Sequence, residues 1–241
     1  MPDDISVSHS SGPEALSQAV AKHHLVVLVD VLRASSTIIT ALAHEASKII
    51  PVPTVEEARE LIYHYPNGFL AGERAAHPPA GFDFGNSPRS FMTTRIRDRP
   101  IILTTSNFTR TLGKPPASAA ILVGAFLNID HVARTARALS AQLQQPISII
   151  SAGSMHGISM EDDFTSSQII IRIQDPDGPP GYADIGDLAR ELLVSRHGNL
   201  LIQAGYEDDI YFCAQPNLYS LTPIFHDGGF IPYSPELQFS D

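Results

Sequence analysis

The sequence lacks the features that mark several classes of protein. Its 241 residues contain one cysteine, Cys213, which excludes an internal disulfide and a thiolate metal site. Lysine and arginine number 16 against 26 aspartates and glutamates, and the resulting charge of −10 disfavours non-specific attraction to nucleic acid or to an anionic membrane. No apolar run reaches membrane-spanning length, and the N-terminus shows no secretory signal. We therefore expect a cytoplasmic protein with neither nucleic acid nor a membrane as its partner.

Two motifs of phosphate and ester chemistry are also missing. The chain has no Gly-x-x-x-x-Gly-Lys-Ser/Thr loop for nucleotide phosphates and no Gly-x-Ser-x-Gly turn for a nucleophilic serine. The sequence therefore contains no motif that would indicate a kinase, a nucleotide hydrolase of that type or an esterase. Cys213 lies on an apolar helical face, which predicts a place in the core rather than a role as nucleophile.

Short apolar runs alternate with helical patterns along most of the chain. The run at 25–29 is typical of a strand buried on both faces, and 34–42 has helical spacing. Further strands are expected at 48–52, 69–71, 100–104, 120–123 and 147–153, mostly with helices between them. This rhythm predicts an α/β fold in three layers, with a largely parallel or mixed sheet and helices on both faces.

The chain also offers a candidate boundary. Residues 174–187 are rich in proline, glycine and aspartate, as linkers often are. We expect an α/β domain over 1–175 that carries most of the site, and a smaller helical part over 176–241 packed on it, unless the two form a single domain. Residues 220–232 could add a late strand at an edge of the sheet.

Polar and acidic residues follow several of the expected strands, in the segments Asp30–Arg33, Gly72–Arg74, Thr104–Asn107 and Glu161–Asp163. Because the carboxyl ends of parallel strands meet at one edge of a sheet, these segments should converge. Hard oxygen ligands of this kind suit Mg²⁺ rather than zinc. We therefore expect a pocket that binds Mg²⁺ and a small anionic substrate.

Each segment also has a simpler interpretation. Ser35 and Ser36 could form an anion-binding site at a helix N-terminus. They could also merely cap that helix, beside a salt bridge at the end of the strand. The three acids at 161–163 could simply stabilise the start of a helix, and Asp208 and Asp209 could be solvated surface acids. His156 lies in a loop that the sheet argument places near the site. A homodimer is expected from the frequency of twofold symmetry among soluble proteins.

The ordered motifs resemble the 2-phosphosulfolactate phosphatase family. They are VDVLRASSTI, AGER, GFDFGNSP, TTSNFT, SAG followed by EDD, and GYEDDI, and they extend from about Val27 to Pro223. The resemblance implies a Mg²⁺-dependent hydrolase that removes phosphate from 2-phospho-3-sulfolactate in coenzyme M biosynthesis. It also implies an α/β fold particular to that family.

The resemblance places fifteen residues on motif positions. The catalytic candidates are Asp30, Arg33, Arg74 and Asn107. The candidates for binding the substrate and its phosphate are Arg33, Ser35, Ser36, Arg74, Asn86, Ser87, Asn107 and Thr109, and those for the metal are Glu73, Asp83, Glu161, Asp162, Asp208 and Asp209. Asp30 could act as a general base toward water or as a nucleophile that becomes phosphorylated.

Two positions depart from the family pattern. Phe108 follows Asn107 where glycine is common, and Ala75-Ala76-His77 replaces a glycine-bearing turn after Arg74. A phenylalanine at a position that needs positive φ would cost on the order of 1 kcal/mol or more. These departures keep a second hypothesis open, a non-catalytic anion-binding or interaction protein that retains the fold. A purely structural subunit is the third.

Overall fold

The computed structural model describes residues 5–154 and 157–237, over which nine strands and nine α-helices are formed. The strands are β1 (Val7–Ser11), β2 (Leu25–Val29), β3 (Lys48–Pro51), β4 (Phe69–Gly72), β5 (Pro100–Thr104), β6 (Ile121–Gly124), β7 (Ile147–Ser151), β8 (Pro223–His226) and β9 (Gly229–Pro232). The helices are α1 (Gly12–Ala21), α2 (Ala34–Ala43), α3 (Val55–Leu61), α4 (Phe108–Leu112), α5 (Ile129–Leu143), α6 (Met160–Gln174), α7 (Ile185–Val194), α8 (Arg196–Gln203) and α9 (Glu207–Cys213).

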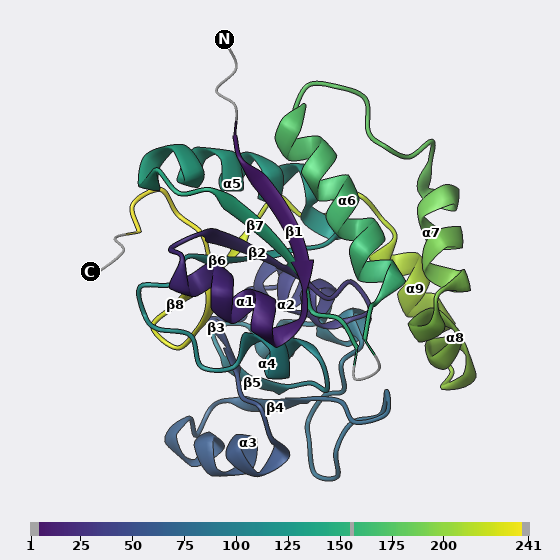
Figure 1. Ribbon diagram of the computed structural model, residues 1–241. Coiled ribbons are helices and arrows are strands. Elements are labelled where there is room, and N and C mark those ends of the chain that lie inside the picture. The colour runs from purple at the N-terminus through teal and green to yellow at the C-terminus, as the bar shows by residue number, and fades with distance from the viewer. Residues whose placement is uncertain (1–4, 155–156, 238–241) are drawn as a thin grey trace.

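All the strands belong to one mixed sheet in the order β1-β7-β2-β6-β8-β9-β3-β5-β4. Helices α5 and α6 pack side by side on one face of the β6-β2-β7 block, and α1 and α2 cover the other face (Figure 1). The predicted three-layer α/β fold is therefore confirmed. Every residue of β2 is buried, as its continuous apolar run predicts.

The C-terminal hairpin of β8 and β9 joins two parallel blocks in the middle of the sheet. Its pairings with β6 and with β3 are antiparallel, and so is the hairpin itself, so the β3-β5-β4 block runs against the β6-β2-β7-β1 block along the ladder. The expectation that the tail adds an edge strand is wrong. Because β8 and β9 are short and mostly buried, they fill the gap between the blocks rather than extend the sheet.

In a flat sheet, this reversal would place the carboxyl ends of β4 and β5 at the opposite edge from those of β2 and β7. Five steps separate β2 from β5, and a twist of about 20–25° per strand accumulates to about 100–125° over them. In a flat sheet β2 and β5 would point in opposite directions, but this twist brings their directions to within about 90° of each other. The carboxyl ends of β2, β4, β5 and β7 can then face a common space.

The β3-β5-β4 block has a core on each face. Ile49 and Ile101 belong to the main core, whereas their neighbours Ile50 and Ile102 pack with Ala58 of α3 in a smaller cluster. This alternation is the period of two that a strand imposes on its side chains.

The N-terminal strand β1 was not predicted. It pairs with β7 at the edge of the sheet, and its polar, largely exposed sequence VSHSS gives no hydrophobic pattern. Helices α7, α8 and α9 pack together beside α6 (Figure 1). Among the described residues, no helix has both the length and the apolar composition needed to cross a bilayer.

Candidate active site

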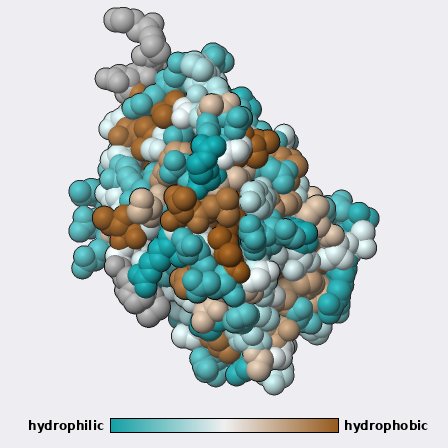
Figure 2. Space-filling model, turned by 90° about the vertical axis from the view of Figure 1, so that its right-hand side faces the viewer, coloured by the Kyte–Doolittle hydropathy of each residue, from teal (hydrophilic) through white to brown (hydrophobic). Residues whose placement is uncertain are grey.

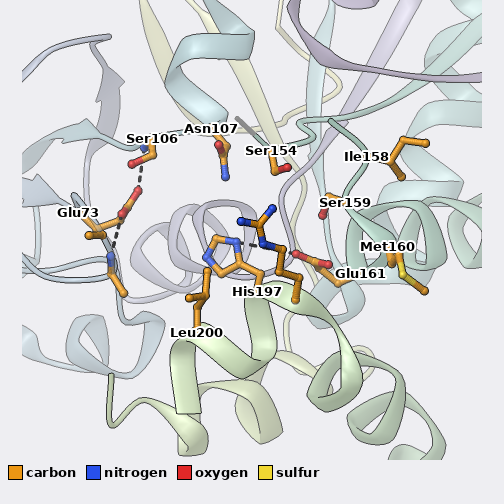
Figure 3. Close-up of a pocket in the computed structure, with 13 residues that line it drawn as sticks. Glu73, Ser106, Asn107, Ser154, Ile158, Ser159, Met160, Glu161, His197 and Leu200 are labelled. Atoms are coloured by element: carbon orange, nitrogen blue, oxygen red, sulfur yellow. Dashed lines mark hydrogen bonds and ion pairs between the residues drawn. The ribbon is translucent and has the colours of Figure 1, made fainter. Parts of the chain in front are cut away.

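A pocket of about 550 Å³ opens between the loops after β4, β5 and β7 and the start of α8. Figure 3 shows Glu73 and Glu161 on opposite sides of it, with His197 of α8 between them. A narrow niche of about 10 Å³ borders the pocket, with Asp30 and Arg33 in its lining. Pocket and niche share four lining residues: Glu73, Ala76, Asn107 and His197. Polar segments from separate parts of the chain therefore do meet.

Three exposed apolar side chains, Ile158, Met160 and Leu200, also line the pocket. Figure 3 shows Leu200 beside His197 and the other two near Ser159. In Figure 2, which faces the side of the molecule that carries α7 and α8, hydrophobic residues gather across the middle of the surface. These three side chains can give a ligand apolar contacts only.

Asp30 follows β2 directly and is 5% exposed. Its carboxylate accepts backbone hydrogen bonds from Ala34, at 3.3 Å, and from Phe108. Burial, followed by the negative charges of Glu73 and Glu161, raises the pKa of Asp30 from 3.8 to about 7. Asp30 can therefore take up and release a proton near neutral pH.

Glu161 and Asp162 lie in the first turn of α6, where Ser159 caps the helix by accepting the Asp162 N–H. Asp162 also accepts the backbone N–H of Val31 at 2.9 Å, from a segment far away in sequence. Burial and the charges of Asp30 and Glu161 raise the pKa of Asp162 well above its ordinary value. The two acids thus stabilise a helix end. Together with Asp30 and Glu73 they form the acidic cluster of the site.

Glu73 is held rigidly at the rim of the niche. Its Oε1 accepts the Ser106 N–H at 2.7 Å and its Oε2 accepts the Ala76 N–H at 3.2 Å. The preceding Gly72 has φ of 150°, and a Cβ there would overlap the Thr104 carbonyl oxygen. Only glycine therefore allows β4 to approach β5 closely enough to deliver Glu73.

The turn after Glu73 has left-handed backbone angles without glycine. Arg74 and His77 pair through two backbone hydrogen bonds, and Ala75 and Ala76 between them have φ of 51° and 69°. Positive φ at both central positions is typical of a type I′ turn, which favours Asn-Gly. The replaced family turn is therefore a real source of backbone strain.

Phe108 shows no such strain. It is the first residue of α4, does not have positive φ, and packs in the core with its ring centroid 5.7 Å from that of Phe230. The hypothesis that glycine's backbone freedom is needed there is wrong, because the chain enters a helix at this point.

Arg33 is engaged with protein groups. Its Nη1 donates to Asp209 at 2.6 Å, its Nη2 donates to the Ala76 carbonyl at 3.0 Å, and its guanidinium lies 4.2 Å from the Tyr206 ring centre. Asp209 also accepts the Ser87 hydroxyl at 2.7 Å. Asp209 is 2% exposed, so the expectation of a solvated acid is wrong. This buried pair fixes the niche wall and neutralises the charge of Arg33.

Three hydroxyls expected at the phosphate are buried and bonded to backbone. Ser35 donates to the Leu28 carbonyl, Ser36 to that of Val31 and Thr109 to that of Thr105. The anion at the start of α2 is the Asp30 carboxylate itself, which accepts the Ala34 N–H. The structure does not bring these hydroxyls into the pocket.

Three further candidates also lie outside the pocket lining. Arg74 donates to the Thr104 hydroxyl at 2.9 Å. Asp83 accepts the Leu70 N–H at 3.0 Å, and Asp208 forms an exposed ion pair with Arg89. These contacts give the three side chains structural partners away from the acidic cluster.

Asn86 and Asn107 do face the niche. Asn86 is 4% exposed, and its Oδ1 has no hydrogen-bond partner within the described part of the chain. A buried amide without a partner costs stability unless a ligand or water completes it. Asn107, the residue before α4, lines both niche and pocket.

Arg196 and His197 begin α8 and line the pocket, and neither was predicted from the sequence. His197 Nδ1 lies 3.8 Å from Glu161 Oε1, and burial lowers the pKa of His197 despite the nearby acids. Two adjacent basic residues at the start of a helix, where acidic residues are preferred, are the sequence feature that could have indicated a role in the site.

Two single-residue expectations remain to be placed. Cys213 is buried and burial raises its pKa to about 12, so its predicted place in the core is confirmed. His156 lies outside the described residues.

The acidic cluster has the donor chemistry of a magnesium site but not a dense ligand cage. Across residues 5–154 and 157–237, no three histidine, cysteine or acidic side chains form a group that could hold a metal ion. Magnesium typically binds to proteins through one or two carboxylates and keeps several waters. Glu73 and Glu161, which line the pocket, fit that simpler requirement.

Comparison with known proteins gives a consistent result. A family model described as 2-phosphosulpholactate phosphatase matches residues 11–228. A protein of Symbiobacterium thermophilum is 34% identical over 85% of this chain and 92% of its own length, and one of Pseudothermotoga lettingae is 34% identical over 91% and 97%. A protein of Thermotoga maritima is 35% identical over 85% and 90%. All three are named "Probable 2-phosphosulfolactate phosphatase".

Proposed function

Since the chain belongs to the 2-phosphosulfolactate phosphatase family, we propose that it hydrolyses the phosphate monoester of a small, strongly anionic hydroxy acid. The candidate substrate is 2-phosphosulfolactate, which water would convert to sulfolactate and inorganic phosphate. The observation that carries this proposal is the buried Asp30 carboxylate at the niche beside the pocket, with Glu73 and Glu161 close enough to disfavour its ionisation.

Phosphate binding is proposed at the boundary of niche and pocket. The side-chain N–H groups of Asn86 and Asn107 supply neutral donors there, and the unpaired Asn86 Oδ1, an acceptor, suits a water or a protonated phosphate oxygen. Arg33, whose charge is balanced by Asp209, is assigned a supporting role because it anchors the Ala76 carbonyl in the niche wall. Fixed dipoles of this kind stabilise developing charge without reorganising during the reaction.

Magnesium is proposed as the cofactor, held by Glu73 and Glu161 together with substrate oxygens. When bound, it would neutralise phosphate charge and lower the pKa of a coordinated water. Glu73 is positioned for this by two backbone N–H groups, and Glu161 by the first turn of α6. Both carboxylates disfavour the ionisation of the buried Asp30, and a cation held by them would offset that repulsion.

Asp30 is proposed as the general base. It would accept a proton from the water that attacks phosphorus, while the P–O bond to the hydroxy acid breaks. A base whose pKa lies near the working pH is the most efficient, and that of Asp30 is about 7. The alternative is attack by Asp30 itself, which would form an aspartyl phosphate that water then hydrolyses.

Phosphate release measured against magnesium concentration tests the function. We expect turnover of 2-phosphosulfolactate that EDTA abolishes and Mg²⁺ restores, and loss of at least 10²-fold in Asp30→Asn. Asp187→Asn, on the surface of α7, is the matched control. Turnover insensitive to EDTA would refute the metal assignment, and no turnover of any phosphorylated hydroxy acid would refute the function.

Rapid quenching separates the two roles of Asp30. We expect no acid-stable, base-labile phosphoenzyme during turnover, and its detection would replace the general base by the nucleophile. The predicted homodimer and cytoplasmic location stay predictions, and light scattering in solution would test the dimer.

A further inference from the structure

Arg196 is the single lysine or arginine among the described residues that line the 550 Å³ pocket. The other arginine of the site, Arg33, lines the niche and is already paired with Asp209. Within the described chain, the Arg196 guanidinium has no hydrogen-bond, ion-pair or ring partner. The pocket therefore contains one guanidinium that no described protein group binds directly, although Glu73 and Glu161 line the same pocket.

The backbone fixes Arg196 at the rim of this pocket. Ser195 caps α8 by accepting the Gly198 N–H at 2.9 Å, and its hydroxyl donates to the Leu192 carbonyl at 2.8 Å. A Cβ at Gly198 would overlap that same carbonyl oxygen, so α7 and α8 meet in a tight corner. The first residue of α8 thus has little freedom to move away from the pocket.

Arg196 also occupies a position that helix electrostatics disfavours. The N-terminus of a helix carries a partial positive charge and prefers acidic residues. No acidic residue lies in the first turn of α8. A basic residue in a place that is unfavourable for folding, and turned to a pocket, is expected where function selects it.

We propose that Arg196 binds the second acid group of the substrate, the carboxylate or sulfonate that lies apart from the phosphate. The inference rests on the proposed function and makes Arg196 the residue that selects phosphate esters of acids over simple phosphate esters. The polar residues that line the pocket near Ile158 and Met160, such as Ser159 and Glu161, include no second cation for such a group (Figure 3). A guanidinium can bind it through two parallel N–H donors.

Steady-state kinetics on two esters test the assignment. The first is 2-phosphosulfolactate, and the second is isopropyl phosphate, which has a secondary ester but no acid group. We expect Arg196→Gln to raise KM for the first about 10- to 100-fold, to change kcat less than about threefold, and to leave isopropyl phosphate unaffected. Arg196→Lys should recover only part of the loss, because a lysine cannot form the paired contact.

Arg190→Gln is the matched control, since Arg190 is an exposed arginine of α7 that pairs with Asp187 outside the pocket. An unchanged KM for 2-phosphosulfolactate in Arg196→Gln, or equal losses on both esters, would overturn the assignment. Circular dichroism would show that each variant is folded.

Calorimetric binding of sulfolactate separates this inference from the proposed function. Sulfolactate carries both acid groups but no phosphate, so its binding requires no turnover. We expect the wild-type protein to bind it and Arg196→Gln to bind it about 10- to 100-fold more weakly. If the wild-type protein hydrolyses no ester but still shows this difference, the function fails and the role of Arg196 stands. Equal affinities in the two proteins would overturn that role.

Discussion

Removal of the buried Asp30 carboxylate should stabilise the folded protein at alkaline pH while it abolishes turnover. The pKa of Asp30 is about 7 in the folded protein and 3.8 as its ordinary value, with burial as the largest cause. Below pH 3.8 the group is protonated in both states and its ionisation costs the fold nothing. As the pH rises from 3.8 to about 7, the unfolded chain releases the proton first, so the free energy of unfolding falls.

The size of the effect follows from the same two values. At pH 8 the ionised group lowers the free energy of unfolding by about 4 kcal/mol, and at pH 5 by about 1.5 kcal/mol. Asparagine cannot ionise, so this pH-dependent penalty is absent from Asp30→Asn. The advantage of the variant over wild type should therefore grow by roughly 2.5 kcal/mol between pH 5 and pH 8. At both pH values the net advantage of Asp30→Asn is smaller than the ionisation penalty alone, because the amide cannot accept every hydrogen bond that the carboxylate accepts.

Urea unfolding at the two pH values measures this difference. Far-UV circular dichroism is the suitable signal because the chain has no tryptophan, and EDTA keeps divalent cations out of the site. In thermal unfolding of a chain of this length, the Tm advantage of Asp30→Asn over wild type should grow by about 5–10 °C from pH 5 to pH 8. Asp187→Asn, which removes a surface carboxylate, is the control. An identical difference between Asp30→Asn and wild type at pH 5 and pH 8 would refute the reasoning.

Three further variants test contacts around the site. Asp209→Asn leaves the buried Arg33 without its carboxylate and should lower the free energy of unfolding in urea by about 3–5 kcal/mol. Gly72→Ala drives a methyl group into a backbone carbonyl, so we expect a lower Tm and lost activity from a displaced β4. The double variant Ala75→Asn with Ala76→Gly suits both positive φ angles and should raise the free energy of unfolding by up to about 1 kcal/mol.

Two of these variants have a matched control. Asp208→Asn changes the exposed acid beside Asp209 and should leave urea stability nearly unchanged. Gly205→Ala also has positive φ but no atom near its added methyl, so it separates backbone strain from overlap at Gly72. If Gly205→Ala lowered Tm as much as Gly72→Ala, steric overlap would not be the cause. A loss of stability in the double turn variant would contradict the assigned turn type.

The sequence allowed much of the polar geometry to be predicted. Asp30 was expected directly after a buried strand, and β2 does end at Val29. The acids at 161–163 were expected to start a helix, and they do, with Ser159 as the cap, since a capped helix start follows from a few adjacent residues. Glu73 and Asn107 also line the pocket that the strand argument anticipated.

Other features could not be predicted because they depend on contacts between distant segments. Asp209 was taken for a solvated or metal-binding acid, yet it is buried against Arg33, which lies far away in sequence. Ser35 and Ser36 were expected to face an anion, but the rotation of α2 turns their hydroxyls to backbone carbonyls. Nothing in the local spacing of these residues distinguishes the two outcomes.

The sequence by itself determined most of the strands and helices, though not β1, and that polar groups follow the strands, because periodicity and capping act over a few neighbouring residues. Only the tertiary structure decided that β8 and β9 lie between two opposed parallel blocks, and that α8 brings Arg196 and His197 to the pocket. The physical reason is that sheet order and helix docking depend on the burial of apolar faces across the whole chain. Such burial selects partners by shape and twist, which no short stretch of residues encodes.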